Sequence, residues 1–290
     1  MNKKQILSYI ITCVFFLTIS SHKLLAQKDK DFEKEIEKPN QYNFDKIDFI
    51  DSENNEKLSG TLISPKTEYS KIIIIVPGSG KNTKNSHYIL AEEILKNNIA
   101  VYRFDDRGVG ESEGNINFSV DQIIRDLYYA YTNIKKASNL SQKNIGILGH
   151  SLGGIATIDN YQKGLNLDFI VLMSTPFEKY GRFTKSQFPF NSIKKVSAKT
   201  VFENIHIPLL FIAGSNDSFL ESEKTADLLR SVNNKNIDVR IIDGLNHFLI
   251  KGNDNWKETK KYNDLYDMDQ KALTEIITWI KNLKLNLNQK

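Results

Sequence analysis

Cysteine is nearly absent from this chain of 290 residues, because Cys13 is its one cysteine. A disulfide framework and a cysteine metal site are therefore excluded, and the fold must be stabilised by packing. The chain also lacks an excess of one charge: its 39 basic and 35 acidic side chains give a net charge of +4. Residues 1–26 hold three lysines and no acid, so the rest of the chain is almost neutral. This balance gives no indication of a nucleic acid or another polyanion as a partner.

Long apolar runs are scarce as well, and the main one lies near the N-terminus. Residues 6–19 are apolar and follow two lysines, which predicts a secretory signal peptide, residues 1–26, ending at Ala26. We therefore expect export to the periplasm or the medium. Leu24 stands where a small residue usually precedes cleavage, so an uncleaved membrane anchor stays an alternative. Contact with the membrane is expected through this segment alone.

The composition after this leader, 40% hydrophobic and 26% charged over the whole chain, is that of a globular domain. A charged segment, residues 27–41, is expected to be flexible, and one domain is expected over residues 42–290. Two β-like runs, residues 42–50 and 57–63, predict an N-terminal antiparallel hairpin. Residues 119–122 (SVDQ) predict a capping box at the start of a helix.

Apolar runs and helical patterns alternate through the rest of the domain. We predict strands within residues 72–76, 99–104, 145–148, 169–173, 209–213 and 239–242, and helices within residues 88–95, 120–134, 155–163, 221–229 and 273–283. This alternation predicts an α/β fold, with a mostly parallel central sheet and helices on both faces. Residues 176–204 are too long for an ordinary connection, and they predict a small helical cap insertion or an elaborated surface loop.

A pentapeptide with two glycines stands between the β-like run of residues 145–148 and the next helix. Residues 149–153 read GHSLG, which is the G-x-S-x-G pattern in a strand–turn–helix context. The glycines leave room where a sharp turn brings backbone segments together. The pattern predicts a nucleophile elbow with Ser151 at its tip.

A serine hydroxyl is a weak nucleophile and needs a base, which a carboxylate orients in turn. His247 follows the last predicted strand, and its loop is expected at the same sheet edge as Ser151. Asp217 follows residues 209–213 directly and is the candidate acid. Asp243, at the end of the last strand, is the alternative. The chain order of the proposed triad is thus Ser151, Asp217, His247.

An oxyanion formed during attack by Ser151 needs two backbone N–H donors. Leu152, the residue after the nucleophile, supplies one candidate. Ser79, in the sequence PGSG of residues 77–80, supplies the other, although the same four residues also fit a plain turn.

Residues 105–112 (DDRGVGES) contain adjacent carboxylates that could suggest metal binding or acid–base chemistry. Their glycines indicate a tight turn after a strand, so we expect Asp106 and Arg107 to hydrogen-bond neighbouring loops. We expect no metal and no cofactor, because a serine triad needs none.

Five motifs together resemble serine hydrolases of the α/β-hydrolase superfamily: PGSG, DDRGVGES, GHSLG, AGSND (residues 213–217) and GLNHF (residues 244–248). More narrowly, the chain resembles exported bacterial esterase D-like and serine aminopeptidase-like hydrolases, over about residues 42–283. The resemblance implies the α/β-hydrolase fold, cleavage of carboxylic esters without a cofactor, and Ser151, Asp217 and His247 as the triad.

The expected substrate is a small-molecule ester with a short or medium acyl group. Peptide or amide bonds and thioesters are alternatives within the same fold. A non-catalytic protein that binds a ligand is an alternative of another class, because this fold carries many functions. The natural substrate and the oligomeric state stay open.

Overall fold

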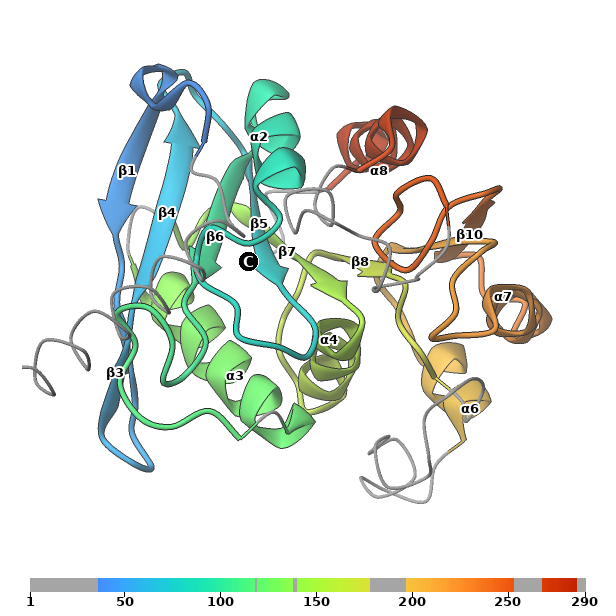
Figure 1. The fold of residues 1–290 in the computed structure, drawn as a ribbon, viewed down its shortest axis with the longest axis horizontal. Helices are drawn as coiled ribbons and strands as arrows, with labels where there is room; N and C mark the ends of the chain where they lie inside the picture. The colour runs from blue at the N-terminus through green and yellow to red at the C-terminus, as the bar shows by residue number, and fades with distance from the viewer. Residues whose placement is uncertain (1–35, 118, 138–139, 178–196, 253–267, 286–290) are drawn as a thin grey trace, which may run out of the picture.

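An eight-stranded sheet lies at the centre of the protein (Figure 1). The computed structural model describes residues 36–117, 119–137, 140–177, 197–252 and 268–285. The predicted signal peptide and residues 178–196 of the predicted cap lie outside these ranges. In the order of the sheet, the strands are β1 (Tyr42–Lys46), β4 (Gly60–Pro65), β6 (Ala100–Phe104), β5 (Lys71–Val76), β7 (Asn144–His150), β8 (Phe169–Met173), β9 (Leu209–Gly214) and β10 (Ile237–Ile242).

The strands from β6 to β10 run parallel, whereas β1 and β4 are antiparallel to their neighbours. Each of the six predicted parallel strands is confirmed. Each parallel strand therefore ends at the same edge of the sheet, where loops from distant parts of the sequence meet.

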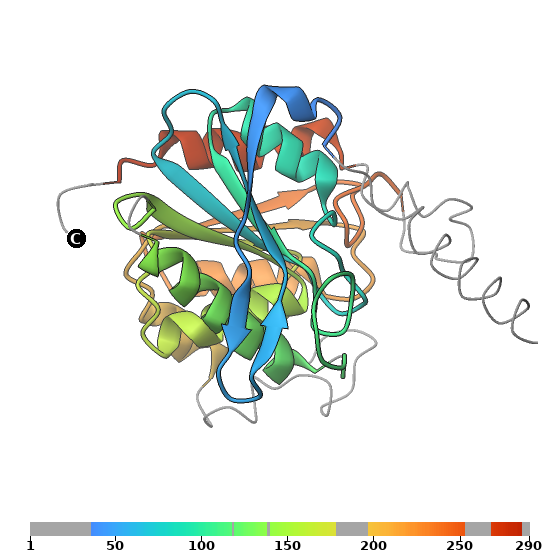
Figure 2. The same cartoon turned by 90° about the vertical axis from the view of Figure 1, so that its left-hand side faces the viewer.

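Helices cover both faces of the sheet, as predicted (Figure 2). On one face lie α2 (Tyr88–Lys96) and α8 (Gln270–Asn282); on the other lie α3 (Val120–Lys136), α4 (Leu152–Gln162), α6 (Ala198–Glu203) and α7 (Ser222–Ser231). Among the described residues, none of the helices has the length and apolar run needed to cross a bilayer.

Strand β5 shows why the central strands read as continuous apolar runs. Ile72 and Ile74 pack in the core beneath α3 and α4, whereas Ile73 and Ile75 pack beneath α2 and α8. Successive side chains of a strand point to opposite faces, so a strand covered on both sides needs apolar residues at each position.

The predicted N-terminal hairpin is confirmed, but it is divided into two pairings. Strand β1 pairs with β4, and β2 (Phe49–Asp51) pairs with β3 (Glu56–Leu58). The division falls where Gly60 lies over the ring of Tyr102: a Cβ on Gly60 would stand 1.9 Å from the Tyr102 hydroxyl. That hydroxyl donates to the carbonyl oxygen of Ile47 at 2.7 Å and holds the bend.

The described end of the segment expected to be flexible packs against the domain. Ile36 is buried, and the short 3₁₀ helix η1 (Pro39–Gln41) leads into β1. The backbone N–H of Glu37 donates to Glu92 of α2 at 3.1 Å. The N-terminal stretch is thus anchored from residue 36 onward.

Of the two hydrogen bonds in the capping box predicted at the start of α3, the first is confirmed. The hydroxyl of Ser119 accepts from the backbone N–H of Gln122 at 3.2 Å, as an N-cap should. The Gln122 side chain does not return the bond: its oxygen accepts from the N–H of Asn117 and its nitrogen donates to the carbonyl of Asn115. This residue therefore ties the preceding loop to the helix.

Candidate active site

Ser151 is the single residue between the end of β7 and the start of α4, and its backbone angles are φ 52° and ψ −121°. Residues with a side chain rarely adopt this positive φ, and such conformations concentrate at functional sites. A Cβ on Gly149 would lie 2.5 Å from the Cα of Gly154, and one on Gly153 would lie 2.2 Å from the carbonyl oxygen of Val76. Both glycines of the pentapeptide are therefore required by close backbone approach, as the sequence predicted.

Asp217 and His247 meet at the same sheet edge. Asp217 Oδ2 lies 2.8 Å from His247 Nδ1, and both side chains are buried. The other carboxylate oxygen of Asp217 accepts from the backbone N–H groups of Phe219 and Leu220, at 2.8 and 3.1 Å. The carboxylate is thus held in one orientation, and it favours a proton on His247 Nδ1, which leaves Nε2 to accept a proton.

The alternative acid, Asp243, points elsewhere. Its Oδ1 accepts from the hydroxyl of Ser215 at 3.0 Å in an exposed position. The structure therefore brings Asp217, and not Asp243, to the histidine.

The loop that carries His247 has its own internal support. The side-chain oxygen of Asn246 accepts from the N–H groups of Phe248 and Ile250, at 2.9 and 3.1 Å. The carbonyl oxygen of His247 faces His150, whose Nε2 lies 3.1 Å away. The candidate base is therefore joined to the residue that directly precedes the candidate nucleophile.

The hydroxyl of Ser151 is half-buried, and it has no hydrogen-bond partner among the described residues. The bond from Ser151 to His247 Nε2 that a triad uses is thus not formed here. In enzymes without substrate such bonds are often long, and they tighten when substrate binds.

The loop of residues 77–80 passes directly beside Ser151. A Cβ on Gly78 would lie 2.8 Å from Ser151 Cβ and 3.3 Å from its Oγ. Among the described residues, neither the N–H of Ser79 nor that of Leu152 donates a hydrogen bond within the protein. Two unused N–H groups beside a nucleophile are what an oxyanion site requires.

Asp106 supports this loop through Asn82, as expected for a structural residue. The Asp106 carboxylate accepts from both the backbone N–H and the side-chain amide of Asn82, each at 2.9 Å. The same amide donates to the carbonyl of Gly78 at 3.1 Å. The DDRG turn thus fixes the loop that borders Ser151.

Arg107 from the same turn lies in a buried ion cluster. It pairs with Asp51 at 2.8 Å and with Glu56 and Asp126, and so joins the β2–β3 pairing to α3. Burial raises the pKa of Asp126 even though Arg107 lies beside it. The expected hydrogen bonds to a neighbouring loop are confirmed for Asp106, whereas Arg107 bonds to two strands and a helix.

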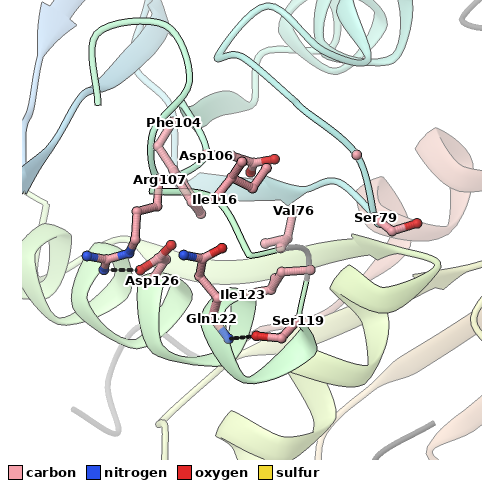
Figure 3. A pocket seen from close by; sticks show the side chains of 12 residues that line it. Val76, Ser79, Phe104, Asp106, Arg107, Ile116, Ser119, Gln122, Ile123 and Asp126 are labelled. Atoms are coloured by element: carbon pink, nitrogen blue, oxygen red, sulfur yellow. Dashed lines mark hydrogen bonds and ion pairs between the residues drawn. The ribbon is translucent and has the colours of Figure 1, made fainter. Parts of the chain in front are cut away.

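A small cavity of about 20 Å³ lies beside the loop of residues 77–80 (Figure 3). Ser79 borders it at one end, and its apolar wall includes Val76, Ile116 and Ile123. Its volume suits one water molecule.

The described residues hold no group of three or more histidine, cysteine or acidic side chains able to bind a metal ion.

Two further histidines lie behind the site, and the sequence assigned neither of them a role. His87 precedes α2 with a left-handed φ of 57°, and its Nε2 lies 3.1 Å from Nδ1 of His150. Burial, together with the charge of Arg103, lowers the pKa of His87 to about 4, and burial lowers that of His150 well below its usual value. In the sequence, the position of His150 inside the pentapeptide was the one indication that either histidine lies near the site.

Comparison with known proteins identifies the fold. Residues 67–201 match the family model described as serine aminopeptidase, S33. An esterase from Pyrococcus furiosus, Pf2001, superposes with a TM-score of 0.61 over 83% of this chain and 92% of its own, at 20% identity. The chain thus has the α/β-hydrolase fold.

Curated relatives of this chain match over parts of their length. Protein phosphatase methylesterase 1 of Candida albicans is 29% identical over 107 residues, which cover 37% of this chain and 29% of the relative. The uncharacterized protein YfhR of Salmonella typhi is 26% identical over 181 residues, which cover 56% of this chain and 61% of the relative. The chain thus spans less than two thirds of either relative.

Proposed function

We propose that this protein cleaves carboxylic esters through an acyl-enzyme formed on Ser151, with His247 as general base and Asp217 as the carboxylate that orients it. One observation carries the proposal: a buried carboxylate–imidazole pair, 2.8 Å apart, stands at the same sheet edge as a strained serine. The names of two similar proteins, a methylesterase and an esterase, agree with ester substrates.

The geometry supports the following steps. His247 Nε2 takes the proton of the Ser151 hydroxyl as its oxygen attacks the acyl carbonyl carbon. The N–H groups of Ser79 and Leu152 hold the resulting oxyanion. When the tetrahedral intermediate collapses, His247 passes the proton to the departing alcohol oxygen. Water then repeats the sequence on the acyl-enzyme and releases the acid.

Asp217 acts through His247 and does not take up the proton itself. It holds Nδ1–H and so keeps Nε2 directed at the serine, and its charge stabilises the imidazolium that forms during each step. The two backbone N–H groups that bind its second oxygen keep the carboxylate from turning away.

A second candidate is removal of an N-terminal residue from peptides, which the description of the matched family favours. That reaction runs through the same serine but must protonate an amine as it leaves. Matched p-nitrophenyl ester and p-nitroanilide substrates distinguish the two candidates. Export, with removal of residues 1–26, is part of the main proposal, and the N-terminus of protein recovered from the periplasm or medium tests it.

Labelling with a fluorophosphonate and turnover of p-nitrophenyl esters of increasing acyl length test the main proposal. Ser151→Ala should lose both signals. Asp217→Asn should lower turnover on the order of 10⁴-fold, since it removes the carboxylate that orients the base. Asp243→Asn is the matched control and should behave as wild type, because Asp243 is exposed and bonds to Ser215.

Labelling that survives in Ser151→Ala would contradict the assigned nucleophile. A folded wild-type protein that neither labels nor turns over esters or anilides would instead favour the ligand-binding alternative.

A further inference from the structure

A line of three histidines runs from the start of α2 to the loop of the candidate base. His87 Nε2 lies 3.1 Å from His150 Nδ1, and His150 Nε2 lies 3.1 Å from the carbonyl oxygen of His247. The ring centroids of His150 and His247 are 4.9 Å apart. His150 thus fills the space between the buried His87 and the base, one residue before Ser151.

The chemistry of the last acceptor sets the direction of each bond. A carbonyl oxygen can only accept, so Nε2 of His150 must carry a proton and donate it to His247. A neutral imidazole has one N–H, so Nδ1 of His150 is then an acceptor. The proton between the two rings consequently belongs to Nε2 of His87.

The surroundings keep both rings neutral. His87 and His150 are 4% and 2% exposed, and burial disfavours their charged forms. The charged or titratable groups facing them are cationic or can become so: Arg103 of β6 acts on His87, and His247 acts on His150. A neutral His150 leaves His247 free to carry the positive charge that catalysis places on it.

We infer that His150 and His87 are positioning residues, which hold the base His247 in line with Ser151 through a directed pair of hydrogen bonds. The inference rests on the proposed function. Asp217 fixes the ring of His247 at Nδ1, and His150 fixes its backbone at the carbonyl oxygen. Because His150 is next to Ser151 in the chain, any movement of the nucleophile also moves the anchor of the base.

Two substitutions of His150 in the full chain separate the hydrogen bond from packing. His150→Gln places an amide nitrogen near the position of Nε2 and can still donate to His247. His150→Phe keeps a ring of similar size and donates nothing. With p-nitrophenyl acetate, we expect His150→Phe to lower kcat at least about tenfold with KM within about twofold, since a misplaced base slows the chemical step. His150→Gln should recover most of that loss.

A measurement on the wild-type protein covers the case in which His150→Phe does not fold. Nitrogen NMR of histidine-labelled protein, with His150 assigned from His150→Gln, reports the tautomer of each ring. We expect His150 to stay neutral, with its proton on Nε2, through the pH range in which an ordinary histidine becomes charged.

Three results would overturn the inference: an Nδ1–H tautomer of His150, protonation of His150 near its ordinary pKa, or wild-type kcat in folded His150→Phe. Failure of the proposed function gives a different pattern, because the wild-type protein would then lack labelling and turnover while the NMR signals still report the hydrogen bonds.

Discussion

Acid should destabilise this protein through His87. Its pKa is lowered to about 4 in the folded protein, against about 6.5 in an unfolded chain. Between these values the unfolded chain binds a proton at this residue and the folded protein does not, so falling pH favours unfolding. The stabilisation is complete above about pH 6.5 and is lost as the pH falls to about 4.

The size of the effect follows from the shift. The full loss amounts to about 3 kcal/mol, of which about 2 kcal/mol has gone by about pH 5. His150 adds to the loss in the same direction, because burial also lowers its pKa. Other groups titrate over this range, so the contribution of His87 is measured as a difference between variants.

Denaturant unfolding at about pH 7.5 and about pH 5 gives the free energy of unfolding of each variant. His87→Gln keeps an amide that can donate to His150 but cannot become charged. It should therefore lose about 2 kcal/mol less stability than wild type between the two pH values. His206→Gln, at an exposed histidine, is the control and should follow wild type. An equal loss in wild type and His87→Gln would refute the reasoning that burial holds His87 neutral.

Two other substitutions test the scaffold around the site. Gly78→Ala should lower ester turnover by about 100-fold, because the new Cβ would stand 2.8 Å from that of Ser151, and unchanged kinetics would show that the loop can yield. Arg107→Met should destabilise the protein by about 3–5 kcal/mol in denaturant unfolding, since it leaves buried carboxylates uncompensated. Lys57→Met, which breaks a surface ion pair with Asp48, should cost less than about 1 kcal/mol; similar losses for both would contradict the cluster's role.

Much of the fold was predictable because burial determines which residue types can occupy each position of a strand or turn. Strands covered on both faces, such as β5 and β8, must be apolar throughout, and the sharp turn at Ser151 demands glycines two positions away on either side. The candidate residues Asp217 and His247 could be named because parallel strands end at one edge.

What could not be predicted depends on contacts between distant residues. Asp217 and Asp243 both follow strands, and only the direction of each side chain decides which one reaches His247. The bond from His87 to His150 joins residues 63 positions apart. No sequence motif contains both residues, so their contact could not be predicted. The bend in the N-terminal hairpin likewise depends on Tyr102 lying beneath Gly60.

The contact between His150 and His247 also bears on the order in which the proposed site assembles. The two residues lie 97 positions apart in the sequence. The candidate base belongs to the loop after β10, and β10 is the edge strand of the sheet. Contacts between such distant segments require a long loop to close, which slows their formation. If Ser151 and His247 act as proposed, a newly made chain holds the serine turn before the base has reached it. Recovery of ester hydrolysis during refolding should then report the docking of β9 and β10, and it should lag behind formation of the serine turn.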